Sequence, residues 1–356
     1  MSKVTQRSRC RSRHRYRCVS STVFTRPTAI ADSAILAALR HGWGLDAVAA
    51  TYLAAGFGSH HWVTTGSTGV QWFVTVDDLA ARDFLGRDPV AAFDGLGKAF
   101  SVAYRLHQCG SDWVVAPVAD PDGRVVRRLD ATYSIAVFPY VKGTVTEEYG
   151  SDAERRTVVE LLAELHQSVK SVASIVRRED FRLPNRADLE AALASIDRRW
   201  VAGPYAEPAR LLLTRHIGGV ERLLDDYDRL AGQALLDQSD WTITHGEPHS
   251  ANILRTDTGM RLIDWDTALL APPERDLWML LPDPYEGDTL AEHYAASTGH
   301  HINVELLRLY RLWWDLSEIG IYLAGFRATH ADTEDMRESW RNLQLFIQAD
   351  RRWPID

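Results

Sequence analysis

The sequence predicts an α+β chain with two lobes, the first built on an antiparallel sheet and the second mainly helical. Between residues 48 and 140, short runs of β-branched and aromatic residues are separated by turn residues, which is typical of strands. From Ser151 onward, apolar residues recur at helical spacing instead. Strands followed by helices in this order indicate an α+β fold, and 356 residues suffice for two lobes.

The first lobe is predicted to contain about five strands and one long helix. Residues 32–41 place Asp-Ser before a helical apolar pattern and predict a short capped helix ahead of the sheet. The long helix is expected at residues 89–107. The strand-like runs lie at residues 48–54, 61–65, 70–76, 113–117, 125–129 and 134–140.

The second lobe is predicted to be built from helices. They are expected near residues 152–172, 186–200, 205–233, 287–298, 303–328 and 332–351. The chain is therefore divided into a basic head at residues 1–30, a first lobe at residues 31–141 and a helical lobe at residues 142–356.

Charge is distributed unevenly along the chain. The first 30 residues hold eight of the 40 Lys and Arg residues and no acid, which leaves 32 basic against 48 acidic residues elsewhere. The folded part should attract a cationic small molecule, and the balance argues against nucleic acid as its main partner. The head lacks an apolar signal segment and is predicted to be disordered. Two alternatives are that translation starts near residue 29 and that the head contacts nucleic acid.

Cysteine content and hydropathy favour a cytoplasmic protein. Cys10, Cys18 and Cys109 cannot form a disulfide framework, which fits a reducing compartment. The most apolar long segment, residues 306–326, is interrupted by charged residues, so it predicts a buried or cleft-lining helix and not a membrane span. No obligate protein partner is indicated.

The segment that carries chemistry is Thr-His-Gly-Glu-Pro-His-Ser-Ala-Asn at residues 244–252, followed by Ile-Asp-Trp-Asp at residues 263–266. Asn252 lies five residues after Glu247 on one loop. Residues 253–263 then predict a short hairpin with a Gly turn, which would return Asp264 to the side of Asn252. An amide oxygen and a carboxylate would face one Mg²⁺ ion, and Glu247 would face an acceptor hydroxyl. Each pair of residues alone is typical of turns, but the ordered set indicates a kinase.

This segment resembles the catalytic loop and metal-binding hairpin of the aminoglycoside phosphotransferase family, which shares the bilobal fold of protein kinases and choline kinases. The resemblance implies ATP and Mg²⁺ as cofactors, Glu247 as the catalytic base, and Asn252 and Asp264 as metal ligands. The family has Asp where this chain has Glu247, so the side chain that carries the carboxylate is longer by one methylene. Residues 56–62, 73–78 and 244–249 resemble most the spectinomycin phosphotransferase-type branch.

Other residues of the segment are assigned supporting roles by the same resemblance. Asp276, in the Pro-Pro-Glu-Arg-Asp-Leu run at residues 272–277, is implied to hydrogen-bond the backbone of the catalytic loop. His245 is implied to anchor that loop. His249 either packs in the loop or lies near the phosphates.

Nucleotide contacts are expected at two places in the first lobe. Gly56, Gly58 and Ser59 occupy the turn between the first two strands, where glycines let backbone N–H groups approach phosphate oxygens, although an ordinary hairpin turn would use them too. Phe138 and Tyr140 end the last strand, where the resemblance implies a hinge whose backbone binds adenine beside an apolar slot.

The largest departure from the family lies in the third strand. Kinases of this fold place a Lys there to neutralise the α- and β-phosphates, but Thr75 stands at that position. Arg82, Lys98 or the pair His60 and His61 are the candidates for the missing charge, and a solvated surface position is the ordinary expectation for Lys98.

The predicted function is ATP-dependent phosphorylation of a hydroxyl on an amino-bearing molecule, an aminoglycoside or aminocyclitol antibiotic in a resistance role. A kinase of choline, homoserine or a sugar is one alternative, and a non-catalytic nucleotide-binding protein is another. Acids of the helical lobe, Glu274, Asp315 and Glu318, are candidates to meet ammonium groups. An exposed ion pair with Arg311 is the favoured account of Asp315.

Overall fold

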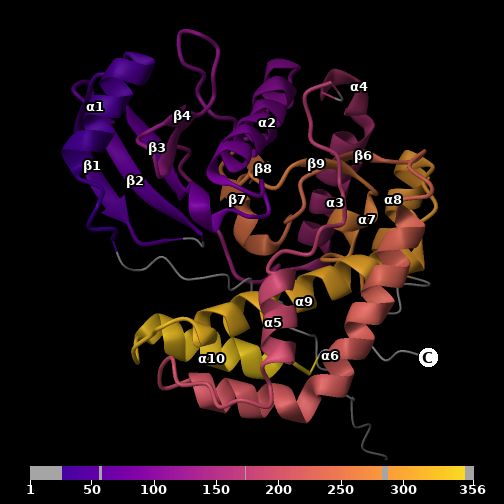
Figure 1. Ribbon diagram of the computed structural model, residues 1–356. Helices are drawn as coiled ribbons and strands as arrows, with labels where there is room; N and C mark the ends of the chain where they lie inside the picture. The colour runs from indigo at the N-terminus through magenta and orange to yellow at the C-terminus, as the bar shows by residue number, and fades with distance from the viewer. Residues whose placement is uncertain (1–25, 56–57, 173, 283–287, 349–356) are drawn as a thin grey trace, which may run out of the picture.

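The computed structural model describes residues 26–55, 58–172, 174–282 and 288–348, and it has the predicted α+β architecture with two lobes (Figure 1). The first lobe, in indigo and violet, holds the five-stranded sheet. The second, in magenta to yellow, is mainly helical. A division after residue 141 stays a prediction.

The sheet of the first lobe is antiparallel, with strand order β1-β2-β3-β5-β4. Its strands are β1 (Ala47–Leu53), β2 (Ser59–Gly66), β3 (Gln71–Asp78), β4 (Arg127–Arg128) and β5 (Tyr133–Pro139). The run at residues 113–117 was predicted as a strand of this sheet, and that prediction is wrong. Val114 makes an isolated bridge to Leu262, and the Val115 backbone N–H donates to the Leu262 carbonyl oxygen at 3.1 Å. The run therefore joins the second lobe's hairpin.

Two helices cover the two faces of the sheet. Along β5, Ile135 and Val137 pack with α1 (Asp32–Trp43), whereas Ala136 and Phe138 lie in the core that contains α2 (Pro89–Gln108). This alternation follows from the two-residue period of a strand. Ile30 is buried in the α1 core, so the packed chain begins slightly before the predicted boundary. Residues 1–25 of the predicted head lie outside the described residues.

The predicted cap of α1 is not formed. Its N-cap is Ala31, which makes no side-chain cap hydrogen bond. The Asp32 carboxylate instead accepts from the indole N–H of Trp62 at 2.9 Å. The side chain therefore ties the helix to β2, because a buried indole N–H needs an acceptor.

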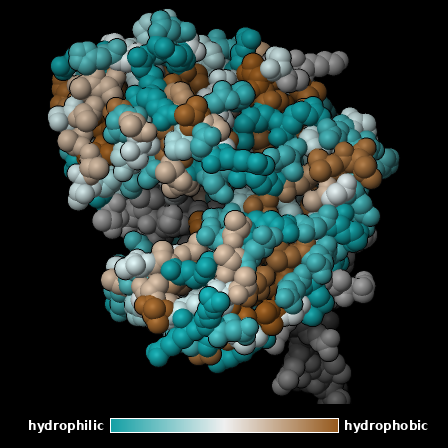
Figure 2. Space-filling model, in the orientation of Figure 1, coloured by the Kyte–Doolittle hydropathy of each residue, from teal (hydrophilic) through white to brown (hydrophobic). Residues whose placement is uncertain are grey.

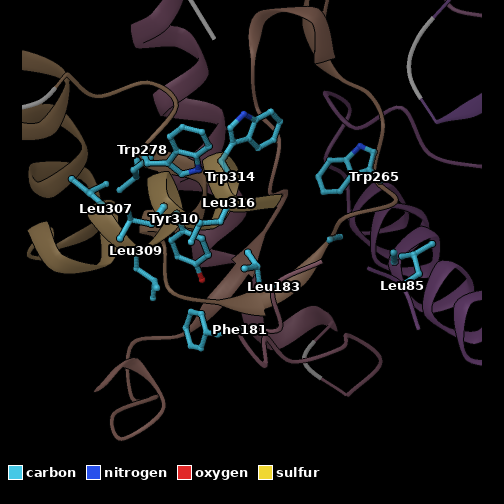
Figure 3. Close-up of a cluster of buried hydrophobic side chains, with 14 of the residues drawn as sticks. Leu85, Phe181, Leu183, Trp265, Trp278, Leu307, Leu309, Tyr310, Trp314 and Leu316 are labelled. Carbon is cyan, nitrogen blue, oxygen red and sulfur yellow. The ribbon is translucent and has the colours of Figure 1, made fainter. Parts of the chain in front are cut away.

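The helical lobe is arranged around α9 (Val304–Arg327), which contacts four other helices. Trp314 and Leu316 of α9 lie in an apolar cluster with Trp278, whose ring centroid is 5.7 Å from that of Trp314 (Figure 3). The other helices of this lobe are α3 (Asp152–Gln167), α4 (Val169–Val172), α5 (Arg186–Ala194), α6 (Ala206–Ala234), α7 (Glu274–Leu277), α8 (Thr289–Thr298) and α10 (Glu334–Phe346). The single helix predicted at residues 152–172 is two helices that meet at Ser168.

The expectation that residues 306–326 form a buried helix is confirmed. Most of α9 is buried, and within the described ranges no helix is long and apolar enough to cross a membrane. The expected exposure of Arg311 and Asp315 is wrong, because their faces of α9 turn into the lobe and both residues are buried. The outer face seen in Figure 2 is mainly hydrophilic, with apolar residues scattered over it.

Short strands at the border of the lobes carry the catalytic segment. β6 (Thr242–Thr244) pairs with β9 (Leu269–Ala271), and the loop after β6 leads through the 3₁₀ turn η2 (Ser250–Asn252). The predicted hairpin is confirmed as β7 (Ile253–Thr256) and β8 (Gly259–Leu262), with Ile253 opposite Leu262. Gly259 has φ +124°, which an L-residue rarely adopts, and closes the turn.

Candidate active site

His245 fixes the catalytic loop to the segment after β8 that bears Asp264. Its ring Nε2 lies 2.9 Å from the Ile263 carbonyl oxygen, and its Nδ1 lies 3.2 Å from the Glu247 backbone nitrogen. Burial lowers the pKa of His245 to about 4, so the ring is neutral and can donate from Nε2 while it accepts at Nδ1. This geometry agrees with the anchoring role that the resemblance implies.

Asp276 holds the same loop from the other side. Its carboxylate accepts from the backbone N–H groups of His245 at 2.9 Å and Gly246 at 2.5 Å, and the His166 ring lies 3.0 Å away. Burial alone would raise the pKa of Asp276, but the His166 ring, with further help from the Arg275 guanidinium, outweighs it and lowers the pKa. The predicted hydrogen bonds from Asp276 to the loop are therefore present.

Gly246 is required at its position for two reasons. Its φ is +98°, and a Cβ added there would lie 2.3 Å from the guanidinium of Arg275. That guanidinium donates to the Thr244 hydroxyl at 3.0 Å and to the Thr267 carbonyl oxygen at 2.9 Å. The loop therefore crosses directly over a buried cation that braces β6 and the segment before β9.

Asn252 and Asp264 are brought together as the sequence predicts. The Ile263 backbone N–H donates to the Asn252 carbonyl oxygen at 3.1 Å, which sets the next residue, Asp264, beside Asn252. The Asn252 amide nitrogen donates to the Glu247 carbonyl oxygen at 2.9 Å, so its amide oxygen is the atom left to act as a ligand. Asp264 has φ +65°, a left-handed conformation that is uncommon outside Gly and is concentrated at functional sites.

The electrostatics of this corner favour a bound cation. Desolvation by the surrounding protein atoms, followed by the charge of Glu247, raises the pKa of Asp264 to about 6, although the residue is exposed on the wall of the site. Burial and the Asp264 charge likewise raise the pKa of Asp266, a carboxylate that the sequence analysis did not assign although it lies two residues after Asp264. Carboxylates that resist ionisation together are stabilised by a divalent ion.

The ligand set fits magnesium held jointly with a nucleotide. Within the described part of the chain, no group of three or more His, Cys, Asp or Glu side chains is placed to hold a metal ion by itself. Mg²⁺ in phosphoryl-transfer sites is commonly bound by one or two carboxylates plus substrate phosphates. One carboxylate and one amide oxygen, from Asp264 and Asn252, agree with a site that the nucleotide completes.

Glu247 is suited to act as a base. Burial would raise its pKa, but the neighbouring His249 and Arg275 side chains outweigh burial and hold the pKa below its usual value. Its carboxylate lies 3.7 Å from the His249 ring nitrogen and lines the main cavity. It is therefore ionised at the wall of the cavity, and His249 is its neighbour in the loop.

A cavity of about 970 Å³ connects both lobes through this site. Phe138 and Tyr140 line it at the predicted hinge, although the Tyr140 backbone N–H already points at the Gln71 carbonyl oxygen at 3.4 Å. Gly58, with φ +77°, and Ser59 line it at the turn between β1 and β2. Gly56 lies outside the described residues. The Ser59 hydroxyl donates to Asp77 at 2.7 Å, so it is engaged by the protein.

Only one of the three acids proposed for ammonium recognition reaches this cavity. Glu318 of α9 lines it beside Trp313 and Trp314. Glu274 is fully buried elsewhere, where it accepts from the Asn303 backbone N–H and pairs with His300, both at 2.8 Å. Glu274 therefore stabilises the start of α9 and does not line this cavity. Asp315 is also buried and does not line the cavity.

Comparisons with known proteins agree with this geometry. The sequence profile of the phosphotransferase enzyme family matches residues 62–313. The chain belongs to this family. It is 32% identical over 263 residues to Protein StrN of Streptomyces griseus, a match that covers 71% of this chain and 77% of that protein. By its family it is a small-molecule kinase, a phosphotransferase with an alcohol group as acceptor, and the predicted resemblance is confirmed.

Solved structures of other phosphotransferases and kinases share the fold. Spectinomycin phosphotransferase APH(9)-Ia, solved with ADP and spectinomycin, superposes with a TM-score of 0.68 at 15% identity, over 91% of this chain and 99% of that one. Amicoumacin kinase hAmiN, with AMP-PNP and Ca²⁺, gives 0.59 at 14% identity over 92% and 96%. Choline kinase LicA from Streptococcus pneumoniae gives 0.57 at 14% identity over 89% and 98%. The bilobal kinase-like fold is therefore established for this phosphotransferase.

Replacement of Gly246 by Ala should destabilise the protein by more than backbone strain alone. A positive φ costs an L-residue about 1–2 kcal/mol, and the new Cβ would also displace Arg275 from its partners. Gly69→Ala is the matched control, because Gly69 has φ +85° with no atom within 4 Å of the added Cβ. Denaturant unfolding should show the larger loss for Gly246→Ala, and equal losses would contradict the contact with Arg275.

Replacement of Asp276 by Ala should lower both stability and turnover. Two buried backbone N–H groups would lose their acceptor, at about 1–3 kcal/mol each, and the loop that carries Glu247 would loosen. The free energy of unfolding and kcat are measured in parallel, with Glu292→Ala on the exposed face of α8 as control. A stable variant with unchanged kcat would show that Asp276 does not hold the loop.

Proposed function

We propose that this phosphotransferase transfers the terminal phosphoryl group of ATP to a hydroxyl of a small cationic molecule, an aminoglycoside or aminocyclitol antibiotic. One observation carries the proposal. A single cavity joins the predicted hinge, the turn at Gly58, the pair Asn252 and Asp264, and an aromatic and acidic chamber on α9, with Glu247 on its wall between the two ends. A nucleotide and an acceptor can therefore meet at that carboxylate.

The chemistry follows from the placement of three side chains. Phosphoryl transfer needs alignment and charge neutralisation more than covalent help from the protein. When bound, Mg²⁺ supplies the charge that offsets the phosphates, and the Asn252 amide oxygen and the Asp264 carboxylate would hold it. Glu247, ionised and fixed through His245, would orient the acceptor hydroxyl and take its proton. In this assignment Glu247, whose side chain is one methylene longer, has the role of the family's Asp.

The nucleotide is proposed to lie in the part of the cavity next to the sheet. Phe138 is nearly buried and packs edge-to-face on Phe100, so it offers an apolar wall for a purine. Tyr140 is more exposed at the rim. Gly58, which has no side chain, lines the cavity at the turn between β1 and β2, where its backbone would let phosphates approach closely.

The acceptor chamber supports a cationic substrate. Glu318 is a buried acid on the wall, and Trp313 and Trp314 bring aromatic rings to the same helix. The Trp314 indole N–H is buried and finds no hydrogen-bond partner among the described residues. Aromatic rings attract ammonium groups, Glu318 would ionise beside a bound ammonium group, and an unpaired indole N–H favours a ligand with hydroxyl or ether oxygens. Amino sugars carry both kinds of group.

Turnover should separate this proposal from its alternatives. ATP consumption with Mg²⁺ is measured against aminoglycosides, aminocyclitols including spectinomycin, choline, homoserine and simple sugars. We expect turnover with one of the antibiotics, reduced by about 10²–10⁴-fold in Glu247→Gln, because the hydroxyl loses its base. ATP affinity should change little in that variant.

The control for Glu247 is Glu221→Gln, on the exposed side of α6, which should keep full activity. Turnover only with choline, homoserine or a sugar would replace the antibiotic by a metabolite. ATP binding without turnover on any acceptor would instead indicate a nucleotide-binding protein. Full activity in Glu247→Gln would remove Glu247 from the mechanism.

The pH dependence of stability should report the buried state of Glu318. Burial raises the pKa of this carboxyl to about 8, although its hydrogen bond from Tyr322 opposes the rise. Because the unfolded chain gives up this proton near the usual carboxyl pKa, the unfolded state binds fewer protons between about pH 4.5 and pH 8. The contribution of Glu318 to stability therefore falls as pH rises through this window and is flat above it.

Melting temperatures of the wild type and Glu318→Gln are compared from pH 5 to pH 9. The variant should gain on the wild type as pH rises to about 8, by an amount on the order of 1 kcal/mol or more. Other titrating groups are common to both proteins and cancel in the difference. A constant difference across this range would mean that Glu318 is ionised in the native state.

A further inference from the structure

The third strand of the sheet leaves a phosphate site without its expected cation. Thr75 lies on β3 opposite His61 and Ala136, and it lines the main cavity. Its hydroxyl is buried and has no hydrogen-bond partner among the described residues. A hydroxyl cannot offset the charge of two or three phosphate groups, so a kinase built on this sheet needs a cation from another position.

Two of the three candidates do not supply that charge. Lys98 points outward from α2 with its side chain about half exposed, where it pairs with Asp94 at 2.8 Å. It does not line the cavity. His61 does line the cavity, but burial lowers its pKa to about 4, and the pKa of His60 is lowered by burial as well. Neither ring carries a positive charge near neutral pH.

Arg82 reaches the cavity from the turn that follows β3. The 3₁₀ turn η1 (Leu79–Ala81), capped by the Asp78 carboxylate on the Ala80 N–H at 3.0 Å, folds the chain back. The Arg82 side chain then runs inward and is only 7% exposed. Because an arginine stem is long, a residue beyond the strand's end can place its charge below the sheet's inner face.

The guanidinium of Arg82 lies between the two halves of the site. One terminal nitrogen donates to Asp77 of β3 and to the Ser59 hydroxyl, and the other lies 3.3 Å from the Asp266 carboxylate beyond the metal-binding hairpin. A Cβ added to Gly58 would come within 2.9 Å of it, so the predicted phosphate-covering turn rests directly on this cation. Its Nε is buried and makes no hydrogen bond to any described residue.

The charge of Arg82 is held in place by acids. Burial opposes ionisation of this group, but the nearby carboxylates of Asp77, Asp266 and Asp264 outweigh burial and raise its pKa. Asp77 is 1% exposed and lies at the end of β3, so it can hold one side of the guanidinium fixed. A planar fork fixed on one side still presents further N–H donors on the other.

We propose that Arg82, held by Asp77, binds the nucleotide's phosphates in this enzyme and takes the place of the third-strand lysine. The inference rests on the proposed function, because it assumes a nucleotide in the cavity next to the sheet. A guanidinium binds phosphate oxygens in a bidentate way that an ammonium group cannot reproduce. In the free protein, Asp266 occupies the side of Arg82 that faces the metal ligands, so the phosphates would compete with Asp266 for the same donors.

The test measures how much the phosphates contribute to nucleotide affinity. Calorimetric dissociation constants of ATP, ADP and adenosine are determined for wild type, Arg82→Gln, Arg82→Lys and Lys98→Gln. In Arg82→Gln, the affinity for ATP should fall at least tenfold while that for adenosine stays unchanged. Arg82→Lys should lose part of this preference, and Lys98→Gln should keep all of it.

The ratio of the adenosine and ATP constants is compared within each variant, so a partly unfolded sample does not change it. If Arg82→Gln is too unstable to measure, the reduced ratio in Arg82→Lys carries the test. An unchanged ratio in both Arg82 variants, or equal losses for adenosine and ATP, would overturn the role of Arg82 and leave the proposed function intact. A wild type that binds no ATP would overturn both.

Discussion

The gathering of several carboxylates around one cavity is the constraint on which the rest of this structure depends. Glu247, Asp264, Asp266 and Asp77 come from three different segments; Asp77 and Asp266 are buried, Glu247 is half-buried and Asp264 is exposed. Desolvation and neighbouring like charges raise the pKa values of Asp264 and Asp266, whereas the pKa of Glu247 is lowered. Cations must compensate, and the protein provides one in Arg82. A bound metal ion would provide another.

The framework that holds these charges is a set of hydrogen bonds around the loop. A neutral His245 bridges the loop and the segment after β8 that carries Asp264, and Asp276 accepts the two N–H groups at the start of the loop. Gly246 allows the backbone to cross over Arg275. Because each partner fixes the next, the distance from Glu247 to Asp264 is set by the packing of the lobe and not by the loop alone.

Helix α9 belongs both to the apolar core of its lobe and to the wall of the cavity. Leu309 and Leu316 belong to the lobe's apolar cluster, which is also where Trp278 and Trp314 meet (Figure 3). Trp314 and Glu318 belong to the wall of the cavity as well. A helix so deeply packed cannot move without disturbing the core, so the acceptor chamber has a rigid wall. That rigidity fits a site that must align one hydroxyl with one carboxylate.

The sequence by itself determined the α+β order, the hairpin and the neighbourhood of Glu247, Asn252 and Asp264, because these features are local. A loop of five residues and a hairpin closed by a Gly turn leave little freedom in where three side chains point. Only the tertiary structure decided that the run at residues 113–117 joins the hairpin, that Glu274 braces α9, and that Glu318 reaches the cavity. It also decided which cation faces Asp266, since Arg82 is 184 residues away along the chain. Sequence spacing carries no information about such contacts, which depend on how two lobes pack against each other.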